Sequence, residues 1–125
     1  MIIIDRDVLI EISDKLSKDG EQIYQKIISS GEKVAITSIT LYEILYGLIK
    51  CKKPIQSLLS FTVFEFGRKD AQQAARLEIE LEQEGKKVKR TDIMIASIAI
   101  NRDAILCTFD KDFKELADRL RLLIE

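Results

Sequence analysis

The sequence predicts an α/β fold in which a central, mostly parallel sheet of four to five short strands lies between helices on both of its faces. Short runs of branched apolar residues, typical of buried strands, alternate along the chain with longer segments whose apolar residues recur every three to four positions, as in helices. The chain has 125 residues and contains no internal repeat, low-complexity segment or linker. We therefore expect a single domain that spans residues 1–125.

The first half of the chain begins with the apolar run "MIII", which predicts a strand buried on both faces. Helical periodicity follows on both sides of a second short strand, "EKVAITS". Gly31 predicts the end of one helix, and Pro54 predicts the start of another. In chain order, the expected elements are strand 1–4, helix 8–16, helix 20–31, strand 32–38, helix 39–53 and helix 54–61.

The second half of the chain continues this alternation. The strand-like segment "TVFEFG" precedes a long helical segment that Gly85 closes. The next helix, "TDIMIASIAINRD", is apolar nearly all round, which predicts that it is buried. The expected elements are strand 62–67, helix 69–90, helix 91–103, strand 104–109, helix 110–120 and strand 121–125.

The charge balance and the residue types that are missing narrow the possible functions. The 20 basic and 21 acidic residues nearly cancel, so any binding of nucleic acid has to rest on a local patch. The absence of histidine disfavours the general-base chemistry of metal-independent ribonucleases and of serine and cysteine hydrolases. We expect no membrane span, because no apolar segment is long enough to cross a membrane. We expect no signal peptide, because the start of the sequence lacks a basic segment and a cleavage site. The expected location is the cytoplasm.

Acidic residues recur where the expected strands end or helices begin. They are Asp5 after the first strand, Glu43 in the helix after the second, Asp92 at the start of the apolar helix, and Asp110 with Asp112 after "AILCTF". The carboxyl ends of parallel strands meet at one edge of a sheet, and ligands of such folds bind there. We therefore expect these carboxylates to lie close together.

Each acid also has a plain structural interpretation. The segment "TLYE" fits a capping box in which Thr40 is the N-cap and Glu43 reaches back to it. Thr91 would cap its own helix, and Asp92 would then favour the positive helix end. Asp5 is harder to explain in this way, because a carboxylate directly after four apolar residues is poorly solvated and needs a partner.

Carboxylates that converge without basic partners repel one another unless a cation lies between them. Oxygen ligands of this kind suit Mg²⁺ or Mn²⁺. Such an ion binds phosphate, lowers the pKa of a bound water and supports attack on a phosphodiester. The acids therefore predict metal-dependent chemistry on phosphate esters.

Four segments, taken in order, resemble the PIN domains and, within them, the small VapC-type toxins of prokaryotic toxin–antitoxin pairs. The segments are "IIIDRDVLI", "ITSITLYEILYGL", "TDIMIASIAI" and "TFDKDF", and they extend over nearly the whole chain. The resemblance implies a PIN-like three-layer α/β/α fold and a Mg²⁺- or Mn²⁺-dependent endoribonuclease. It implies catalytic and metal-binding roles for Asp5, Glu43, Asp92 and Asp110, and a more variable fifth metal-binding position at Asp112.

The segment after Asp5 departs from the family pattern at one residue. The family has Thr or Ser directly after the first Asp, and Ser, Asn or Asp one position later. Asp7 fits the second of these positions, whereas Arg6 replaces a small hydroxyl with a long cation. By the resemblance, the aspartates would hold the ion, and Glu43 would complete the pocket and orient the attacking water.

The resemblance also implies three macromolecular partners: an RNA substrate, a VapB-type antitoxin that blocks the acidic pocket, and a second copy of the chain in a homodimer. Basic residues near the acids could contact the RNA backbone; they are Lys86, Lys87, Lys89 and Arg90, and Lys50, Lys52 and Lys53. The helices carry more apolar residues than one core stripe needs, Tyr42 and Tyr46 among them, which is typical of an interface.

Two other functions remain open from the sequence. The segment "IIIDRDVL" also fits the Asp-x-Asp start of haloacid-dehalogenase-type phosphatases, in which the first Asp is the nucleophile, although "TFDKDF" lacks the glycine expected in their late acidic loop. The other alternative is a PIN-like fold whose site has decayed and which acts only as a binding module. The four acids argue against this alternative, and Arg6 argues for it. Metal-dependent RNA cleavage separates the three functions.

Overall fold

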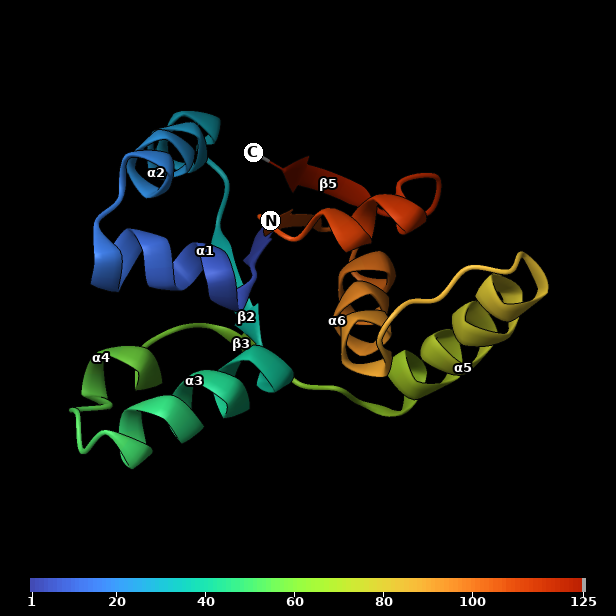
Figure 1. The fold of residues 1–125 in the computed structure, drawn as a ribbon, viewed down its shortest axis with the longest axis horizontal. Coiled ribbons are helices and arrows are strands. Elements are labelled where there is room, and N and C mark those ends of the chain that lie inside the picture. Colours follow the sequence, from blue (N-terminus) through green and yellow to red (C-terminus); the bar gives the residue numbers. More distant parts are fainter. Residues whose placement is uncertain (125) are drawn as a thin grey trace.

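Five parallel strands form the central sheet of the computed structural model, which describes residues 1–124 (Figure 1). They are β1 (Ile2–Ile4), β2 (Val34–Thr37), β3 (Val63–Phe64), β4 (Ile105–Thr108) and β5 (Arg121–Ile124). Their order across the sheet is β3-β2-β1-β4-β5, and every neighbouring pair is parallel. The predicted α/β class and the short parallel strands are therefore confirmed.

Helices cover both faces of this sheet. In chain order they are α1 (Arg6–Ile10), the π-helical η1 (Glu11–Lys15), α2 (Lys18–Ser30), α3 (Ser38–Lys50), α4 (Gln56–Leu59), α5 (Arg68–Gln83), α6 (Arg90–Asn101) and the 3-10 helix η2 (Lys111–Leu116). Figure 1 shows α1 to α4 on one side of the central strands and α5 with α6 on the other. Within residues 1–124, no helix has the length and apolar character needed to cross a membrane.

Two hydrophobic clusters fill the spaces between the layers, because successive residues of β1 point to opposite faces of the sheet. Ile2 and Ile4 belong to the cluster that also contains Ile23 and Ile27 of α2. Ile3 belongs to the other cluster, to which α5, α6 and η2 contribute. The central position of β1 thus explains why neither face of its isoleucine run is polar. It also explains why Asp5, the next residue, is buried.

The start of the first helix differs from the sequence expectation. The helix expected at 8–16 begins at Arg6, because the Asp5 side chain caps it by accepting a hydrogen bond from the Arg6 amide. Its second half, Glu11–Lys15, is π-helical. The cap places Asp5 at the junction between β1 and α1.

The helix expected at 69–90 is shorter in the structure. Helix α5 ends at Gln83, and Gly85 adopts a φ of +72°, a left-handed backbone that glycine tolerates and that turns the chain away. The helix expected at 110–120 is reduced to the six residues of η2. Glu125, the last residue of the strand expected at 121–125, lies outside the described residues.

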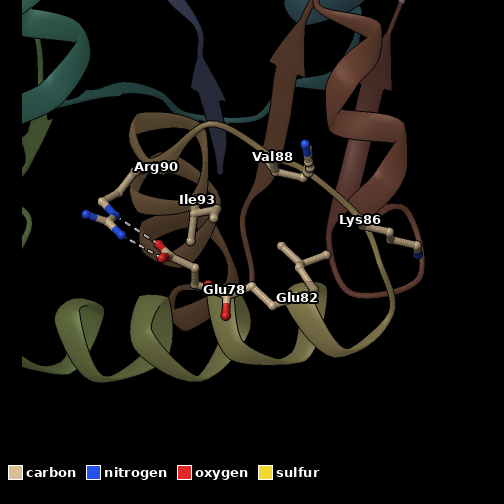
Figure 2. Close-up of a pocket in the computed structure, with 8 residues that line it drawn as sticks. Glu78, Glu82, Lys86, Val88, Arg90 and Ile93 are labelled. Atoms are coloured by element: carbon tan, nitrogen blue, oxygen red, sulfur yellow. Dashed lines mark hydrogen bonds and ion pairs between the residues drawn. The ribbon is translucent and has the colours of Figure 1, made fainter.

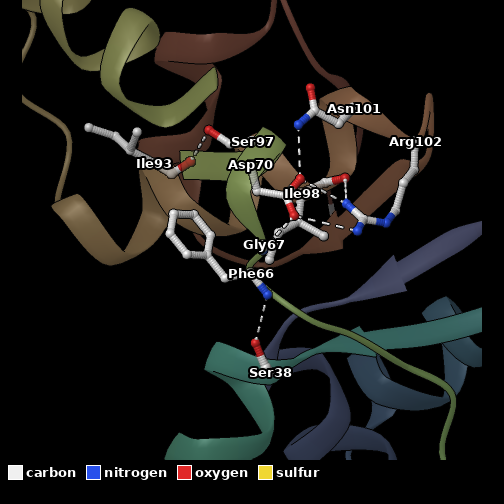
Figure 3. A network of polar contacts seen from close by, with 9 residues as sticks. All are labelled: Ser38, Phe66, Gly67, Asp70, Ile93, Ser97, Ile98, Asn101 and Arg102. Carbon is white, nitrogen blue, oxygen red and sulfur yellow. Dashed lines mark hydrogen bonds and ion pairs between the residues drawn. The ribbon is translucent and has the colours of Figure 1, made fainter. Parts of the chain in front are cut away.

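A buried polar network fastens α5 to the end of α6 (Figure 3). Asp70, which is 3% exposed, accepts hydrogen bonds from Arg102 Nη1 at 3.0 Å, Asn101 Nδ2 at 2.9 Å and the Gly67 amide at 2.9 Å. Burial alone would raise the pKa of Asp70, but these hydrogen bonds outweigh it and hold the pKa below its usual value. The Arg102 guanidinium also lies 4.8 Å from the ring centroid of Phe64, so the network reaches the edge strand β3.

Candidate active site

Asp5 occupies the carboxyl end of the central strand and is held from two sides. Its Oδ1 accepts a hydrogen bond from the Arg6 amide at 2.8 Å, and its Oδ2 accepts one from Thr108 Oγ1, also at 2.8 Å. Thr108 ends β4, the strand beside β1 in the sheet. Burial raises the pKa of Asp5, opposed by these two hydrogen bonds. Thr108 was not among the expected site residues, yet it fixes the orientation of this carboxylate.

Asp7 follows two residues after Asp5, in the first turn of α1, and lies half-buried beside the end of β4. Its two carboxylate oxygens accept from the Phe109 amide at 3.4 and 3.3 Å, and its Oδ1 also accepts from the Val8 amide at 2.7 Å. Burial and, next, the charge of Asp5 raise the pKa of Asp7 to about 6. In the sequence, Asp7 fits the family pattern but has no assigned role. In the structure it lies near enough to Asp5 and Asp110 for their charges to raise its pKa.

Asp92 reaches the site from the other layer, in the first turn of α6. Burial and then the charges of Asp110 and Asp5 raise the pKa of Asp92 to about 6. Its Oδ2 atom is buried and accepts no hydrogen bond from any residue in the described range 1–124. A buried carboxylate oxygen without a donor is costly, so this atom is suited to an external cation or donor.

Asp110 and Asp112 complete the acidic cluster from the segment after β4, where Asp110 precedes η2 and Asp112 lies in its first turn. The Asp110 amide donates to Thr108 Oγ1 at 3.0 Å, so one threonine hydroxyl links Asp110 to Asp5. Asp110 is the N-cap of η2, with its Oδ1 accepting from the Asp112 amide at 2.9 Å. Asp112 is exposed, and its charge is the weakest of those acting on the pKa of Asp92. Asp110 is thus a helix cap, and this role does not remove it from the acidic cluster.

Glu43 is not a helix cap. Helix α3 begins at Ser38 with Thr37 as its N-cap, and Thr37 Oγ1 accepts from the Thr40 amide at 3.1 Å. Glu43 therefore lies in the second turn, where its Oε2 is 3.5 Å from Arg6 Nη1. The predicted capping box was wrong because the threonine three residues earlier caps the helix.

The Thr91 cap was also wrong. Helix α6 begins at Arg90 after Lys89, whose side chain makes no capping hydrogen bond, so Thr91 lies inside the helix. Asp92 keeps its place in the first turn, where the positive end of the helix favours a negative charge. Neither Glu43 nor Thr91 takes part in a helix cap. The purely structural explanation for the acids Glu43 and Asp92 is therefore weaker than the sequence suggested.

The carboxylates as placed do not form a finished coordination sphere: within residues 1–124, no three of the acidic or cysteine side chains have the arrangement of a metal site. Their chemistry nevertheless fits a hard divalent cation. All donors are carboxylate oxygens, Asp92 Oδ2 is buried without a donor, and the aspartates raise one another's pKa values. A divalent cation would relieve each of these unfavourable features.

A groove of about 380 Å³ lies beside the start of α6, lined by α5 and by the segment that joins α5 to α6 (Figure 2). Arg90 forms two hydrogen bonds with the Glu78 carboxylate, at 3.0 and 2.8 Å. Lys86 pairs with Glu84 at 3.2 Å. Two of the four basic residues expected to contact RNA here are thus engaged by acids, whereas Lys89 lowers the pKa of Asp92 and so faces the acidic cluster.

Residues 2–119 match the PIN domain family. The chain belongs to this family. Ribonuclease VapC2 of Rickettsia felis is 33% identical over 81% of this chain and 83% of its own. A crystal structure of VapBC2 from Rickettsia felis bound to a DNA fragment from their promoter has a chain with 29% identity and a TM-score of 0.81, covering 100% of this chain and 99% of that one.

A more distant structure shares the fold. A chain in the crystal structure of FitAcB from Neisseria gonorrhoeae superposes with a TM-score of 0.77 at 22% identity, covering 98% of this chain and 96% of that chain. The predicted resemblance to PIN domains is therefore confirmed. The haloacid-dehalogenase alternative rested on one segment, whereas the PIN match extends over most of the chain.

Proposed function

We propose that this protein is a metal-dependent endoribonuclease, the toxin of a VapBC-type pair, formed by a single PIN-like domain over residues 1–125. The observation that carries the proposal is the cluster of aspartates at the carboxyl ends of β1 and β4, with one buried oxygen of Asp92 left without a donor. The relative from Rickettsia felis, which is named a ribonuclease, supports the same activity.

Three aspartates would hold the ion, Mg²⁺ or Mn²⁺: Asp5, Asp92 and Asp110, with Asp112 at the rim and Glu43 as the fourth acid of the pocket. When bound, the ion lowers the pKa of a bound water and offsets the charge of the phosphodiester. Thr108 keeps Asp5 oriented, and burial excludes water from behind the carboxylates.

The proposed partners are an RNA, a VapB-type antitoxin and a second copy of the chain, in the cytoplasm. Large apolar side chains on α3 support a protein interface: Tyr42, Tyr46 and Ile49 are 70%, 60% and 61% exposed. Light scattering should show a homodimer, and a monomer at high micromolar concentration would contradict this part. Antitoxin binding should stop RNA cleavage.

The test of the activity is cleavage of RNA by the purified protein. We expect cleavage with Mg²⁺ or Mn²⁺, no cleavage with a chelator, and products with 5′-phosphates. Asp5→Asn and Asp92→Asn should abolish cleavage in a folded protein, while Asp19→Asn, an exposed carboxylate of α2, should not. Undiminished cleavage by either site variant would overturn the assigned site. A protein that binds RNA or antitoxin but never cleaves would favour the decayed-site alternative.

A further inference from the structure

Arg6 is a cation at the edge of the acidic cluster, between α1 and α3. Its Nη1 lies 3.5 Å from Glu43 Oε2, and its charge lowers the pKa of the neighbouring Asp5. The Arg6 side chain is 52% exposed, and the Glu43 side chain is 31% exposed. The guanidinium is therefore paired with Glu43 on one side and open to solvent on the other.

We infer that Arg6 binds a phosphate of the RNA backbone next to the acidic cluster and that Glu43 positions it for this contact. A guanidinium has five N–H donors in a planar fork that matches the oxygens of a phosphate. The contact with Glu43 uses Nη1, so other donors of the fork remain available to a ligand. This inference rests on the proposed function and gives it a group that holds the substrate.

The charges around the site make such a group necessary. Asp5 and Asp110 raise the pKa of both Asp7 and Asp92, so these four carboxylates lie close together, and their ionised forms repel a polyanion. Of the basic residues on the α5–α6 side, Arg90 and Lys86 are paired with glutamates. Arg6 is the cation that the structure places on the α1–α3 side of the cluster, where it and Lys89 flank the aspartates.

The pairing also changes the role of Glu43. A guanidinium 3.5 Å from the Glu43 carboxylate competes with a divalent cation for this group, whereas Asp92 Oδ2 accepts no hydrogen bond within residues 1–124. We therefore assign Glu43 as a positioning residue that acts through Arg6, and we leave the ion to the aspartates.

The experiment measures RNA binding without cleavage. The parent protein is Asp92→Asn in a chelator, and the probe is a fluorescent single-stranded RNA followed by anisotropy at several salt concentrations. Arg6→Gln should weaken binding about tenfold at low salt, the scale of one hydrogen bond between charged groups. It should also reduce the slope of log K against log salt by about 0.7, the value for one phosphate contact on a single strand.

Arg121→Gln is the matched control. Arg121 begins the edge strand β5, at the end of the sheet away from the carboxyl ends of the strands, and its side chain is 55% exposed, close to the exposure of Arg6. The control should leave both the affinity and the slope unchanged. Arg6→Lys should keep the slope and lose part of the affinity, since an ammonium keeps the charge without the planar fork.

Glu43→Ala separates positioning from simple charge. In the Arg6→Gln background, it removes a repelling carboxylate and should tighten RNA binding. Where Arg6 is present, the loss of positioning should cancel this gain or reverse it. Equal tightening in both backgrounds would overturn the role of Glu43.

Calorimetry of Mn²⁺ binding to the otherwise unmodified protein is the second readout. Arg6→Gln should tighten Mn²⁺ binding by no more than about twofold, because the Arg6 charge acts on the neighbouring Asp5 but is half-exposed and screened by solvent. Tighter Mn²⁺ binding than this with unchanged RNA affinity would show that Arg6 is only an internal counter-ion, and it would overturn the inference. A parent protein that binds no RNA would instead overturn the proposed function itself.

Discussion

Thr108 donates a hydrogen bond to Asp5 across 103 residues of sequence, with 2.8 Å between Thr108 Oγ1 and Asp5 Oδ2. The bond exists because β1 and β4 are neighbours and Ile4 pairs with Cys107, which sets the next residues side by side. It lowers the pKa of Asp5 against the raising effect of burial.

Replacing Thr108 with valine should therefore weaken Mn²⁺ binding about tenfold, the lower end of the range for groups that orient metal ligands. Valine keeps the branched shape and the strand preference, so the fold should persist. Thr108→Ser keeps the hydroxyl and should bind Mn²⁺ nearly as well as the parent. Calorimetry measures both, and equal losses in the two variants would point to packing, in place of the hydrogen bond, as the cause.

Asp92→Asn should make the metal-free protein more stable, by an amount that grows with pH. The pKa of Asp92 is raised from 3.8 to about 6, so the folded state favours the protonated carboxyl. That contribution is complete below pH 3.8 and is lost as the pH rises through about 6. Asparagine is neutral at every pH and escapes the loss.

The measurement is the melting temperature of both proteins in a chelator between pH 4 and pH 8. The two proteins should melt at similar temperatures at the acid end, and the variant should melt higher above pH 6. Asp19→Asn serves as an exposed control and should give no such trend. A constant difference across the whole range would mean that the ionisation of Asp92, made unfavourable by burial and then by the neighbouring aspartates, is not the cause.

Mn²⁺ binding should release protons near pH 6 and release almost none at pH 8. Burial and neighbouring charge raise the pKa values of Asp7 and Asp92 to about 6, and a cation favours their charged forms. Calorimetry in two buffers with different ionisation enthalpies measures the number of protons. Asp7→Asn should reduce it at pH 6, and an unchanged proton count would exclude Asp7 from the coupled cluster.

The sequence was sufficient for the fold class and for the strand ends after which Asp5 and Asp110 lie, because both follow from local patterns. Buried strands appear in the sequence as apolar runs. Asp5 directly follows such a run, where a buried carboxylate needs a partner. What the sequence could not supply depends on pairings between distant segments. Thr108 contacts Asp5 because of the register between β4 and β1. Arg6 contacts Glu43 because α1 and α3 lie close together.

The wrong capping box has a related origin. Thr37 and Thr40 both fit the N-cap preference, and only the end of β2 at Thr37 selects between them. Asp70 was missed for the opposite reason: an acid at the start of a polar helix gives no sign that it is buried. Its partners, Asn101 and Arg102, lie more than thirty residues away.

Asp70→Ala should destabilise the protein by about 3 kcal/mol, the scale for removing one partner of a buried ion pair. Arg102 would lose its carboxylate, and Asn101 and the Gly67 amide would lose their acceptor. Urea unfolding of the metal-free protein measures the difference, with Asp19→Ala as the exposed control. Metal binding should be unaffected in the folded variant, because Asp70 belongs to the network between α5 and α6.

The pH dependence of this loss should have the opposite sign to that of Asp92. Asp70 has a lowered pKa in the folded state, so its contribution is present above the ordinary value of 3.8 and declines as the pH falls further. The gap in unfolding free energy between the parent and Asp70→Ala should therefore be constant from pH 5 to pH 8 and narrow below pH 4. A gap that widens in acid would show that Asp70 is protonated in the folded protein, in conflict with its three donors.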